Sequence, residues 1–303
     1  MSAATTGGTE FSRRTRMTPY FEDVQSHYDL SDDFYRLFLD PTQTYSCAYF
    51  ERDDMTLAEA QRAKIDLSLS KLGLKSRMTL LDAGCGWGAT IHRAIEKYDV
   101  NVIGLTLSEN QRNYVQRHLI DSELVCSSGR HAEVRLQGWE QFHDPVDRIV
   151  SIGAFEHFGT DRYDDFFKMA SAVLSADGVM MLHTIVLPSD EDFAARELPI
   201  TMRHLKFFKF IMGEIFPGGR LPFVSVVEEH AKKAGFRVER VQPLRVHYAR
   251  TLEIWAAALE ARRDEAIAIQ SEEIYNRYAK YLTGCAELFN DGYTDVCQFT
   301  LAK

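Results

Sequence analysis

The chain has 303 residues, of which 45% are hydrophobic and 26% are charged, a composition typical of globular proteins. This composition excludes a largely disordered chain, a collagen-like repeat and a disulfide scaffold. The 35 basic and 44 acidic side chains give a net charge of −9, which argues against a general nucleic-acid binder.

The five cysteines are odd in number and show no CxxC spacing, so the sequence predicts no metal site and a reducing, cytoplasmic location. The longest run without a charge, residues 178–189, is shorter than the roughly 18 apolar residues that span a bilayer. Peripheral contact with a membrane stays open. Residues 1–18 have no apolar stretch after their arginines, and we predict a disordered tail there and not a signal peptide.

The first predicted element is a helix that begins after Thr56, because Thr56 and Glu59 have the spacing of an N-terminal capping box. An apolar pattern follows at Ala60, Ala63, Leu67 and Leu72. We assign residues 19–74 to an N-terminal helical segment. Next come a short apolar strand at 79–83, a glycine-rich turn, and a helix that begins at residue 89.

Strands and helices then alternate along the chain. Ser108 and Gln111 have the spacing of a second capping box. The patterns predict strands at 100–107, 148–153, 178–187, 236–243 and 295–301, and helices at 162–174, 225–234, 251–269 and 271–289. This alternation indicates a mostly parallel α/β sheet. We find no linker and predict a single domain over 19–303, with a helical insertion at 189–222 that interrupts the alternation.

The glycine-rich turn carries the strongest local signal, a DxGxGxG pattern of Asp82, Gly84, Gly86 and Gly88 between a strand and a helix. A dinucleotide fingerprint is spaced GxGxxG and binds pyrophosphate, which the carboxylate of Asp82 would repel. The pattern instead suits a ligand with a cationic amino group, such as S-adenosylmethionine. The alternative is a glycine-rich turn that binds nothing.

Two later segments have positions from which they can contact the same ligand. Gln111 follows the second strand and is a candidate for the ribose hydroxyl groups. Trp139 offers a face for stacking on adenine, and Glu140 offers an acceptor for the exocyclic amine of adenine. The alternative for Trp139 is a half-buried loop aromatic.

Five segments together make the sequence resemble the cyclopropane-fatty-acid synthase family, and within it most closely the mycolic acid cyclopropane synthases and methyltransferases of mycobacteria. These segments are residues 44–50, 80–88, 104–111, 153–158 and 214–222, and the resemblance runs from about Phe21 to Lys303. It implies a seven-stranded S-adenosylmethionine-dependent methyltransferase fold. It also implies methyl transfer to a double bond of a long acyl chain, carried on acyl carrier protein.

The resemblance also implies site residues. Those for the cofactor are Tyr45, Ser46, Leu80, Asp82, Gly84, Cys85, Gly86, Gly88, Thr106, Leu107, Gln111, Trp139 and Glu140. A bicarbonate ion is expected to contact the backbones of Cys47 and Ile185 and the side chains of Glu156, His183 and Tyr248. The late cysteine considered catalytic in the family matches Cys285. Residues 121–133, with Cys126, depart from the family pattern, and we predict an altered loop beside the adenine pocket.

The bare residues also allow structural interpretations. Glu156 would be an acid at a helix start, His183 a core histidine, Tyr248 an amphipathic tyrosine and Cys285 a small buried hydrophobe. The implied chemistry passes through a carbocation, which aromatic faces stabilise without attacking it. We expect Tyr45, Tyr248 and Phe155 to act in this way. A thiolate would capture the cation, so Cys285 is a weak catalytic candidate.

Three functions remain open at this point. The first is a cyclopropane synthase, and the second is a methyltransferase of the same family that gives methyl-branched, shifted-alkene or oxygenated products. The third is a non-catalytic S-adenosylmethionine sensor. The residues Glu156 and His183 favour the first, because together they suit a bicarbonate base.

The insertion at 189–222 carries many phenylalanines and methionines, and its spacing alone favours a core-facing helix. Because it is aromatic on more than one face and carries Lys206 and Lys209, we predict instead a wall of an acyl tunnel. Its basic residues would then face an acidic carrier protein or phosphate.

Overall fold

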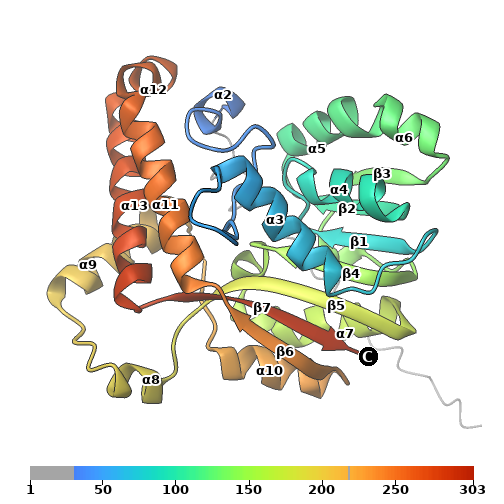
Figure 1. Cartoon of the computed structure of the whole chain (residues 1–303). Helices are drawn as coiled ribbons and strands as arrows, with labels where there is room; N and C mark the ends of the chain where they lie inside the picture. Colours follow the sequence, from blue (N-terminus) through green and yellow to red (C-terminus); the bar gives the residue numbers. More distant parts are fainter. Residues whose placement is uncertain (1–30, 218) are drawn as a thin grey trace, which may run out of the picture.

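The computed structural model describes residues 31–217 and 219–303, so the predicted tail at 1–18 and the start of the N-terminal segment lie outside the described residues. Seven strands form one sheet in the order β3-β2-β1-β4-β5-β7-β6, as Figure 1 shows. The first five of these are parallel, and β7 runs antiparallel to both of its neighbours. The strands are β1 Thr79–Ala83, β2 Asn101–Thr106, β3 Ala132–Leu136, β4 Val146–Ile152, β5 Leu174–Val186, β6 Arg237–Pro243 and β7 Asp295–Ala302. The predicted mostly parallel α/β fold is confirmed.

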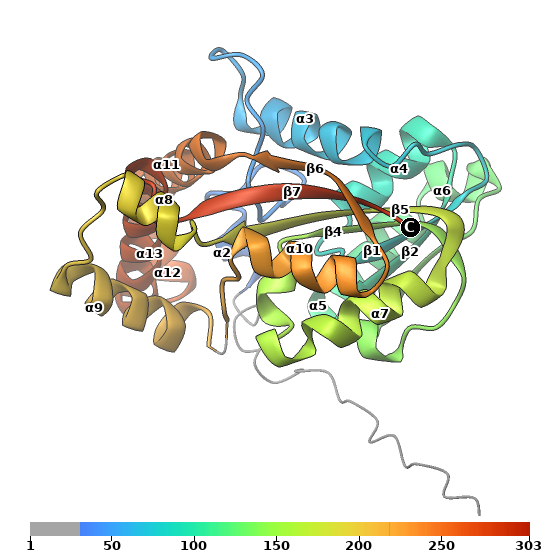
Figure 2. The same ribbon diagram turned by 90° about the horizontal axis from the view of Figure 1, so that it is seen from below.

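Helices cover both faces of the sheet, with α3 and α4 on one face and α7 and α10 on the other (Figure 2). Ile65, Leu69 and Ile91 pack on the first face, and Phe166 and Phe167 pack on the second. The α-helices are α2 Asp32–Tyr35, α3 Leu57–Ser70, α4 Ala89–Tyr98, α5 Glu109–Val115, α6 Glu123–Ser128, α7 Tyr163–Val173, α8 Asp190–Ala195, α9 Met202–Phe210, α10 Val224–Lys233, α11 Arg245–Ala261, α12 Arg263–Ile269 and α13 Glu272–Asp291. Shorter turns of 3₁₀ or π helix are η1 Gln116–Ile120, η2 Trp139–Gln141, η3 Phe155–His157, η4 Thr160–Arg162 and η5 Ile211–Ile215. No helix in the described ranges is both long and apolar enough to cross a membrane.

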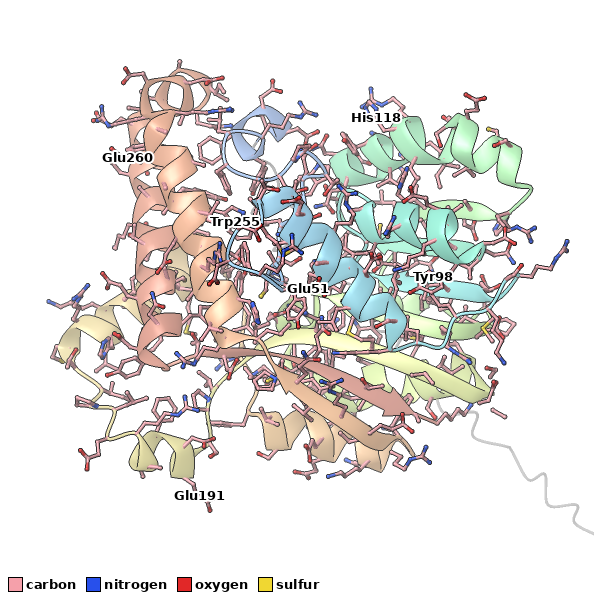
Figure 3. The ribbon with its side chains drawn as sticks, in the orientation of Figure 1. Glu51, Tyr98, His118, Glu191, Trp255 and Glu260 are labelled. Atoms are coloured by element: carbon pink, nitrogen blue, oxygen red, sulfur yellow. The ribbon has the colours of Figure 1, made fainter. Side chains whose placement is uncertain are left out.

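A separate helical part stands at the carboxyl end of the parallel strands and consists of the α11–α13 pair with α8 and α9 beside it (Figure 1). Its core is aromatic: Trp255, labelled in Figure 3, is fully buried on α11 and contacts the rings of Phe38 and Tyr45. The helix α9 is held close to α13 because Gly284 leaves room for Phe207, whose ring would lie 2.2 Å from a Cβ at that position.

Two predicted helix boundaries differ from the structure. The helix predicted at 251–269 begins earlier, at Arg245, and Arg262 divides it into α11 and α12. Arg262 has φ −117° and ψ 29°, outside the helical region, and no glycine or proline marks the break. The turn lets Ala266 of α12 become buried beside α13.

The segment at 121–133 is not a loop beside a pocket, as the sequence had led us to expect. It forms α6 and the start of β3, whose Ala132 pairs with Val102 at the outer edge of the sheet. No residue of this segment lines the pocket described below.

The helix α3 begins with the predicted capping box, but it buries a more polar face than its apolar pattern indicates. Gln61, Lys64 and Ser68 are buried along it, whereas Ala63 and Leu67 are only half-buried. These polar side chains of α3 contact Ser46 and Gln298 of β7.

Candidate active site

A pocket lies at the carboxyl ends of β1, β2 and β4, where parallel sheets bind their ligands. Eleven residues from the predicted cofactor set line it: Tyr45, Ser46, Asp82, Gly84, Cys85, Gly86, Thr106, Leu107, Gln111, Trp139 and Glu140. Leu80 and Gly88 do not. Leu80 is fully buried within β1, and Gly88 caps α4 with φ +85°, where a Cβ would lie 3.1 Å from Val115.

The glycine-rich turn forms the floor of the pocket. Gly84 has φ +105°, and a Cβ there would lie 2.5 Å from the Cβ of Ala154, so only glycine fits. Gly86 has φ +54°, and a Cβ there would meet no protein atom within 4 Å. A ligand can therefore lie directly against the backbone at Gly86.

The helix α3 fixes the segment that carries Tyr45 and Ser46. The amide of Gln61 donates to the carbonyl oxygens of Thr44 (3.2 Å) and Ser46 (2.8 Å). The hydroxyl of Tyr45 donates to that of Tyr281 on α13 (3.2 Å), which ties the pocket to the helical part.

Lys64 is a pocket residue that the sequence reasoning missed. Its amine is buried and donates to Oγ of Ser46 at 2.7 Å. Burial lowers the pKa of Lys64 to about 8 and raises the pKa of Asp82 to about 7, and each charge partly offsets the effect on the other. The sequence held one signal for this: Lys64 lies four residues after Ala60 and therefore on the same, buried face of α3.

The end of β2 presents Gln111 through a network that differs from the predicted capping box. Ser108 accepts from the backbone N–H of Gln111 (3.2 Å), as predicted. The side chain of Gln111 does not return to Ser108; its Oε1 accepts from Oγ1 of Thr106 at 2.8 Å. This contact holds the amide of Gln111 at the pocket wall.

Trp139 and Glu140 form the opposite wall. The ring of Trp139 is buried and packs edge-on against Phe166, with ring centroids 5.4 Å apart. Arg162 donates to Oε1 of Glu140 at 3.0 Å, while Oε2 is buried without a hydrogen-bond partner among the described residues. Burial raises the pKa of Glu140 above its ordinary value, against the pull of Arg162. The unpaired oxygen can accept a ligand amine.

Glu156 and His183 lie behind the pocket, whose lining includes Ala154 and His157 but not Glu156 itself. Oε1 of Glu156 accepts from the backbone N–H of Ile185 at 2.7 Å, two residues from His183 on β5. The hydroxyl of Thr184 also lies near the Glu156 carboxylate and acts to lower its pKa. Oε2 of Glu156 and Nε2 of His183 are both buried, and neither has a hydrogen-bond partner within the described ranges. Burial raises the pKa of Glu156 above its ordinary value. Burial and the positive charges of Lys64 and Lys71 hold the pKa of His183 well below its usual range.

The remaining predicted residues belong to the aromatic core of the helical part. Tyr248 packs on Trp255 and Phe289, and the backbone of Cys47 is buried in the same cluster. Cys285 packs at its border, and burial raises the pKa of its thiol to about 12, so the reactive thiolate is strongly disfavoured.

Phe155 does not join Tyr45 and Tyr248, contrary to our expectation. Its ring stacks on Tyr163 with centroids 4.2 Å apart and is fully buried against α7. The two residues that follow it in η3 serve the site instead: His157 lines the pocket and Glu156 accepts from Ile185.

His157 is a second residue that sequence reasoning missed. It lines the pocket, and its ring contacts Phe216 from the end of the insertion, with centroids 5.8 Å apart. Burial lowers the pKa of His157 to about 4. Arg220 donates its backbone N–H to the carbonyl oxygen of Glu156 (3.2 Å), so the end of the insertion lies directly over the site.

Among the described residues, no group of three or more His, Cys, Asp or Glu side chains is arranged to hold a metal ion. The two unpaired buried atoms belong to the side chains of Glu156 on η3 and His183 on β5, and the hydrogen bond from Ile185 to Glu156 joins these two elements. Buried polar atoms are rarely left unpaired, so such a pair indicates a ligand position.

Comparison with known proteins gives consistent matches over nearly the whole chain. Residues 15–299 match the family model described as mycolic acid cyclopropane synthetase. The chain is 63% identical over 287 residues to cyclopropane mycolic acid synthase 1 of Mycobacterium tuberculosis. The matched residues make up 95% of this chain and 99% of that protein. The structure of the cyclopropane synthase MmaA2 from Mycobacterium tuberculosis matches with a TM-score of 0.92 at 62% identity, over 95% of this chain and 99% of the other. The mycolic acid cyclopropane synthase CmaA1, solved in complex with SAH and CTAB, matches with a TM-score of 0.90 at 63% identity over the same shares.

Proposed function

Because the chain belongs to the mycolic acid cyclopropane synthetase family of S-adenosylmethionine-dependent methyltransferases, we propose that it transfers a methylene group to a cis double bond of a long acyl chain of the mycolic acid type. The observation that carries this proposal is the pair of unpaired buried atoms on Glu156 and His183 beside the cofactor pocket. Ring closure requires a base that removes a proton from the transferred methyl group, and these two atoms suit a bicarbonate ion in that role.

The pocket residues fit S-adenosylmethionine, which supplies an electrophilic methyl group when bound. Asp82, at the end of β1, suits its ammonium group, and the amide of Gln111 is placed for the ribose. The free Oε2 of Glu140 is placed to accept from the adenine amine while Trp139 covers the ring. The complex of CmaA1 with SAH supports this assignment.

The residues behind the pocket fit a bicarbonate ion, which supplies a base when bound. Bicarbonate has one O–H group for the carboxylate of Glu156 and further oxygens that accept hydrogen bonds. Tyr248 and the backbone of Cys47 are the other groups that we assign to this site. The backbone N–H of Ile185 donates to Glu156, so we assign Ile185 the role of holding that carboxylate in place. Tyr45 and Tyr248 present aromatic faces in the same buried region, where a cation on the acyl chain is stabilised without being captured.

The insertion supports the assignment of a long acyl substrate. Phe216 contacts Tyr281 of α13 as well as His157, so ring contacts join the end of the insertion to a residue that lines the pocket. CTAB, which is bound to CmaA1, is a detergent with a long alkyl chain. We assign the residues at 189–222 to the wall and the mouth of the acyl site.

A carrier protein is the proposed source of the acyl chain. Lys206 and Lys209 are exposed on α9 and form no ion pair with any described residue, whereas Arg203 is paired with Glu287. Met202 and Leu205 beside them are 67% and 50% exposed. A basic helix with exposed apolar side chains complements an acidic partner that carries an apolar cargo.

The test is turnover of S-adenosylmethionine with a cis-monounsaturated acyl chain on acyl carrier protein, in buffer with and without bicarbonate. Cyclopropane and methyl-branched products each gain one carbon, so NMR of the product must identify the ring. We expect a ring and a requirement for bicarbonate. A methyl branch or an oxygenated product would favour the alternative reaction of the family, and binding of the cofactor without turnover would indicate a sensor.

A further inference from the structure

Gln298 lies in the middle of β7 and reaches three polar groups that belong to other elements. It is fully buried and stands opposite His183 of β5 in the antiparallel register. Its Nε2 donates to Nδ1 of His183 at 3.2 Å and to Oγ of Ser68 at 3.0 Å. Its Oε1 accepts from the amine of Lys71. Neither Gln298 nor Lys71 belongs to the site residues assigned above.

The identity of these groups fixes the direction of every hydrogen bond. An ammonium group only donates, so the oxygen of Gln298 must face Lys71 and the NH₂ group must face His183. An NH₂ group also only donates, so Nδ1 of His183 must be a bare acceptor. Burial and the charges of Lys64 and Lys71 keep the imidazole neutral, since they hold its pKa well below the usual range. A neutral imidazole with a bare Nδ1 carries its proton on Nε2.

We propose that Gln298, held by Lys71, is a positioning residue that keeps the proton of His183 on Nε2, so that His183 presents an N–H donor to an anion in the site. Nε2 is the atom that has no partner among the described residues. His183 then binds the anion and does not itself act as the base in the resting enzyme. The donor of His183 and the acceptor on Glu156 are complementary to the two ends of a bicarbonate ion.

The inference rests on the proposed function only for the identity of the anion, because the position of the proton is a property of the free protein. It is measured by long-range hydrogen–nitrogen NMR on protein labelled at the histidine ring nitrogens. The His183 signal is identified by its loss in His183→Asn. We expect a protonated Nε2 and a bare Nδ1 in the free wild-type protein.

Gln298→Glu replaces the donor with an acceptor of the same size, which should draw the proton to Nδ1 and abolish the wild-type pattern. We expect kcat to fall by about 10 to 100-fold, as is typical for residues that orient a site ligand, with the Kd for S-adenosylhomocysteine unchanged. Gln298→Met removes the donor without a new charge and should mix the two tautomers. Gln141→Glu is the matched control, because Gln141 is exposed and lies outside the pocket lining, and it should keep both the tautomer and kcat.

A wild-type spectrum with the proton on Nδ1, or with both nitrogens protonated at neutral pH, would overturn the proposal even if neither variant folds. An unchanged tautomer in folded Gln298→Glu would overturn it as well. If the product proves to be methyl-branched, the cyclopropane assignment fails while the tautomer result stands, so the two failures are distinguishable.

Discussion

Gly86 is the residue at which the backbone is most open to the ligand, because a side chain there would enter the pocket and touch no protein atom. We predict that Gly86→Val lowers the affinity for S-adenosylhomocysteine by more than about tenfold, that is more than about 1.4 kcal/mol, which calorimetric titration measures. The valine would also be strained at φ +54°. Gly73→Val is the matched control, since Gly73 has φ +58° in similar open space outside the pocket lining. Wild-type affinity in Gly86→Val would show that the ligand lies elsewhere.

Substitution of two buried glutamates should affect cofactor binding and turnover separately. Glu156→Gln keeps an oxygen for the N–H of Ile185 but replaces the free acceptor with an NH₂ group. We expect turnover to fall by a factor on the order of 10² to 10⁴, the range for loss of acid–base function, with cofactor affinity retained. Glu140→Gln should do the reverse and weaken cofactor binding. Loss of cofactor binding together with activity in Glu156→Gln would mean that Glu156 is a cofactor ligand and that its role is misassigned.

Cys285 matches a cysteine that has been considered catalytic in the family, but its buried surroundings disfavour that role. Burial raises the pKa of its thiol to about 12, so the thiol stays protonated at neutral pH, far below the pH at which it would ionise. Cys285→Ala should therefore keep substantial activity in a steady-state assay. Its circular dichroism spectrum and thermal midpoint serve as the control for folding. Complete inactivation of a folded variant would restore a catalytic role to the thiol.

At the scale of elements, the sequence of α9 fits both a helix that packs on the core and a helix that forms a wall of the acyl site. Phe210 is buried in the helical part, and Phe207 nests on Gly284, which fits the core-facing interpretation of the spacing. The same helix leaves Met202, Leu205 and two unpaired lysines exposed. It therefore packs with one side and presents a second side outward.

Reversal of Lys206 and Lys209 to glutamate should weaken docking of an acidic carrier protein. We expect the apparent KM for carrier-bound substrate to rise, more at low salt, while kcat changes little, because exposed charges act mainly on encounter. Lys75→Glu with Lys168→Glu makes the same change in net charge at exposed positions of other elements. If both double variants had the same apparent KM for carrier-bound substrate at low ionic strength, Lys206 and Lys209 would have no role in docking the carrier protein.

At the scale of the whole molecule, the pocket joins parts that are distant in sequence. Asp32 of α2 accepts from both Trp87 Nε1 (3.0 Å) and Asn110 Nδ2 (2.7 Å), so the N-terminal segment closes over the glycine-rich turn and α5. Tyr45 connects the same region to α13. A ligand in the pocket therefore contacts the sheet and the N-terminal segment together.

Ligand binding should accordingly stabilise the entire fold. At a free S-adenosylhomocysteine concentration of about 100 times Kd, the free energy of unfolding should rise by about 2.7 kcal/mol, seen as a higher Tm in calorimetry. A pyrophosphate dinucleotide at equal concentration is the control and should not raise Tm, because Asp82 lines the pocket and its carboxylate would repel pyrophosphate. Stabilisation by the dinucleotide would contradict our interpretation of the DxGxGxG turn.

Local patterns in the sequence determined much of this protein. The DxGxGxG turn, the Thr56 cap and the alternation of strands and helices depend on residues within a few positions of one another, so their backbone geometry follows from steric and hydrogen-bonding rules. These patterns placed Gly84 and Gly86 in the pocket and predicted the mostly parallel sheet, while the resemblance to a known family supplied Glu156 and His183.

Tertiary packing alone decided which side chains meet. Lys64 enters the pocket because α3 buries its polar face against Ser46, and Phe155 leaves it because α7 offers a stacking partner. Gln298 and His183 are 115 residues apart, and only the register of β7 on β5 brings them into hydrogen-bond contact. No local pattern encodes such a register, because it depends on how the complete sheet satisfies its buried polar groups and its apolar core.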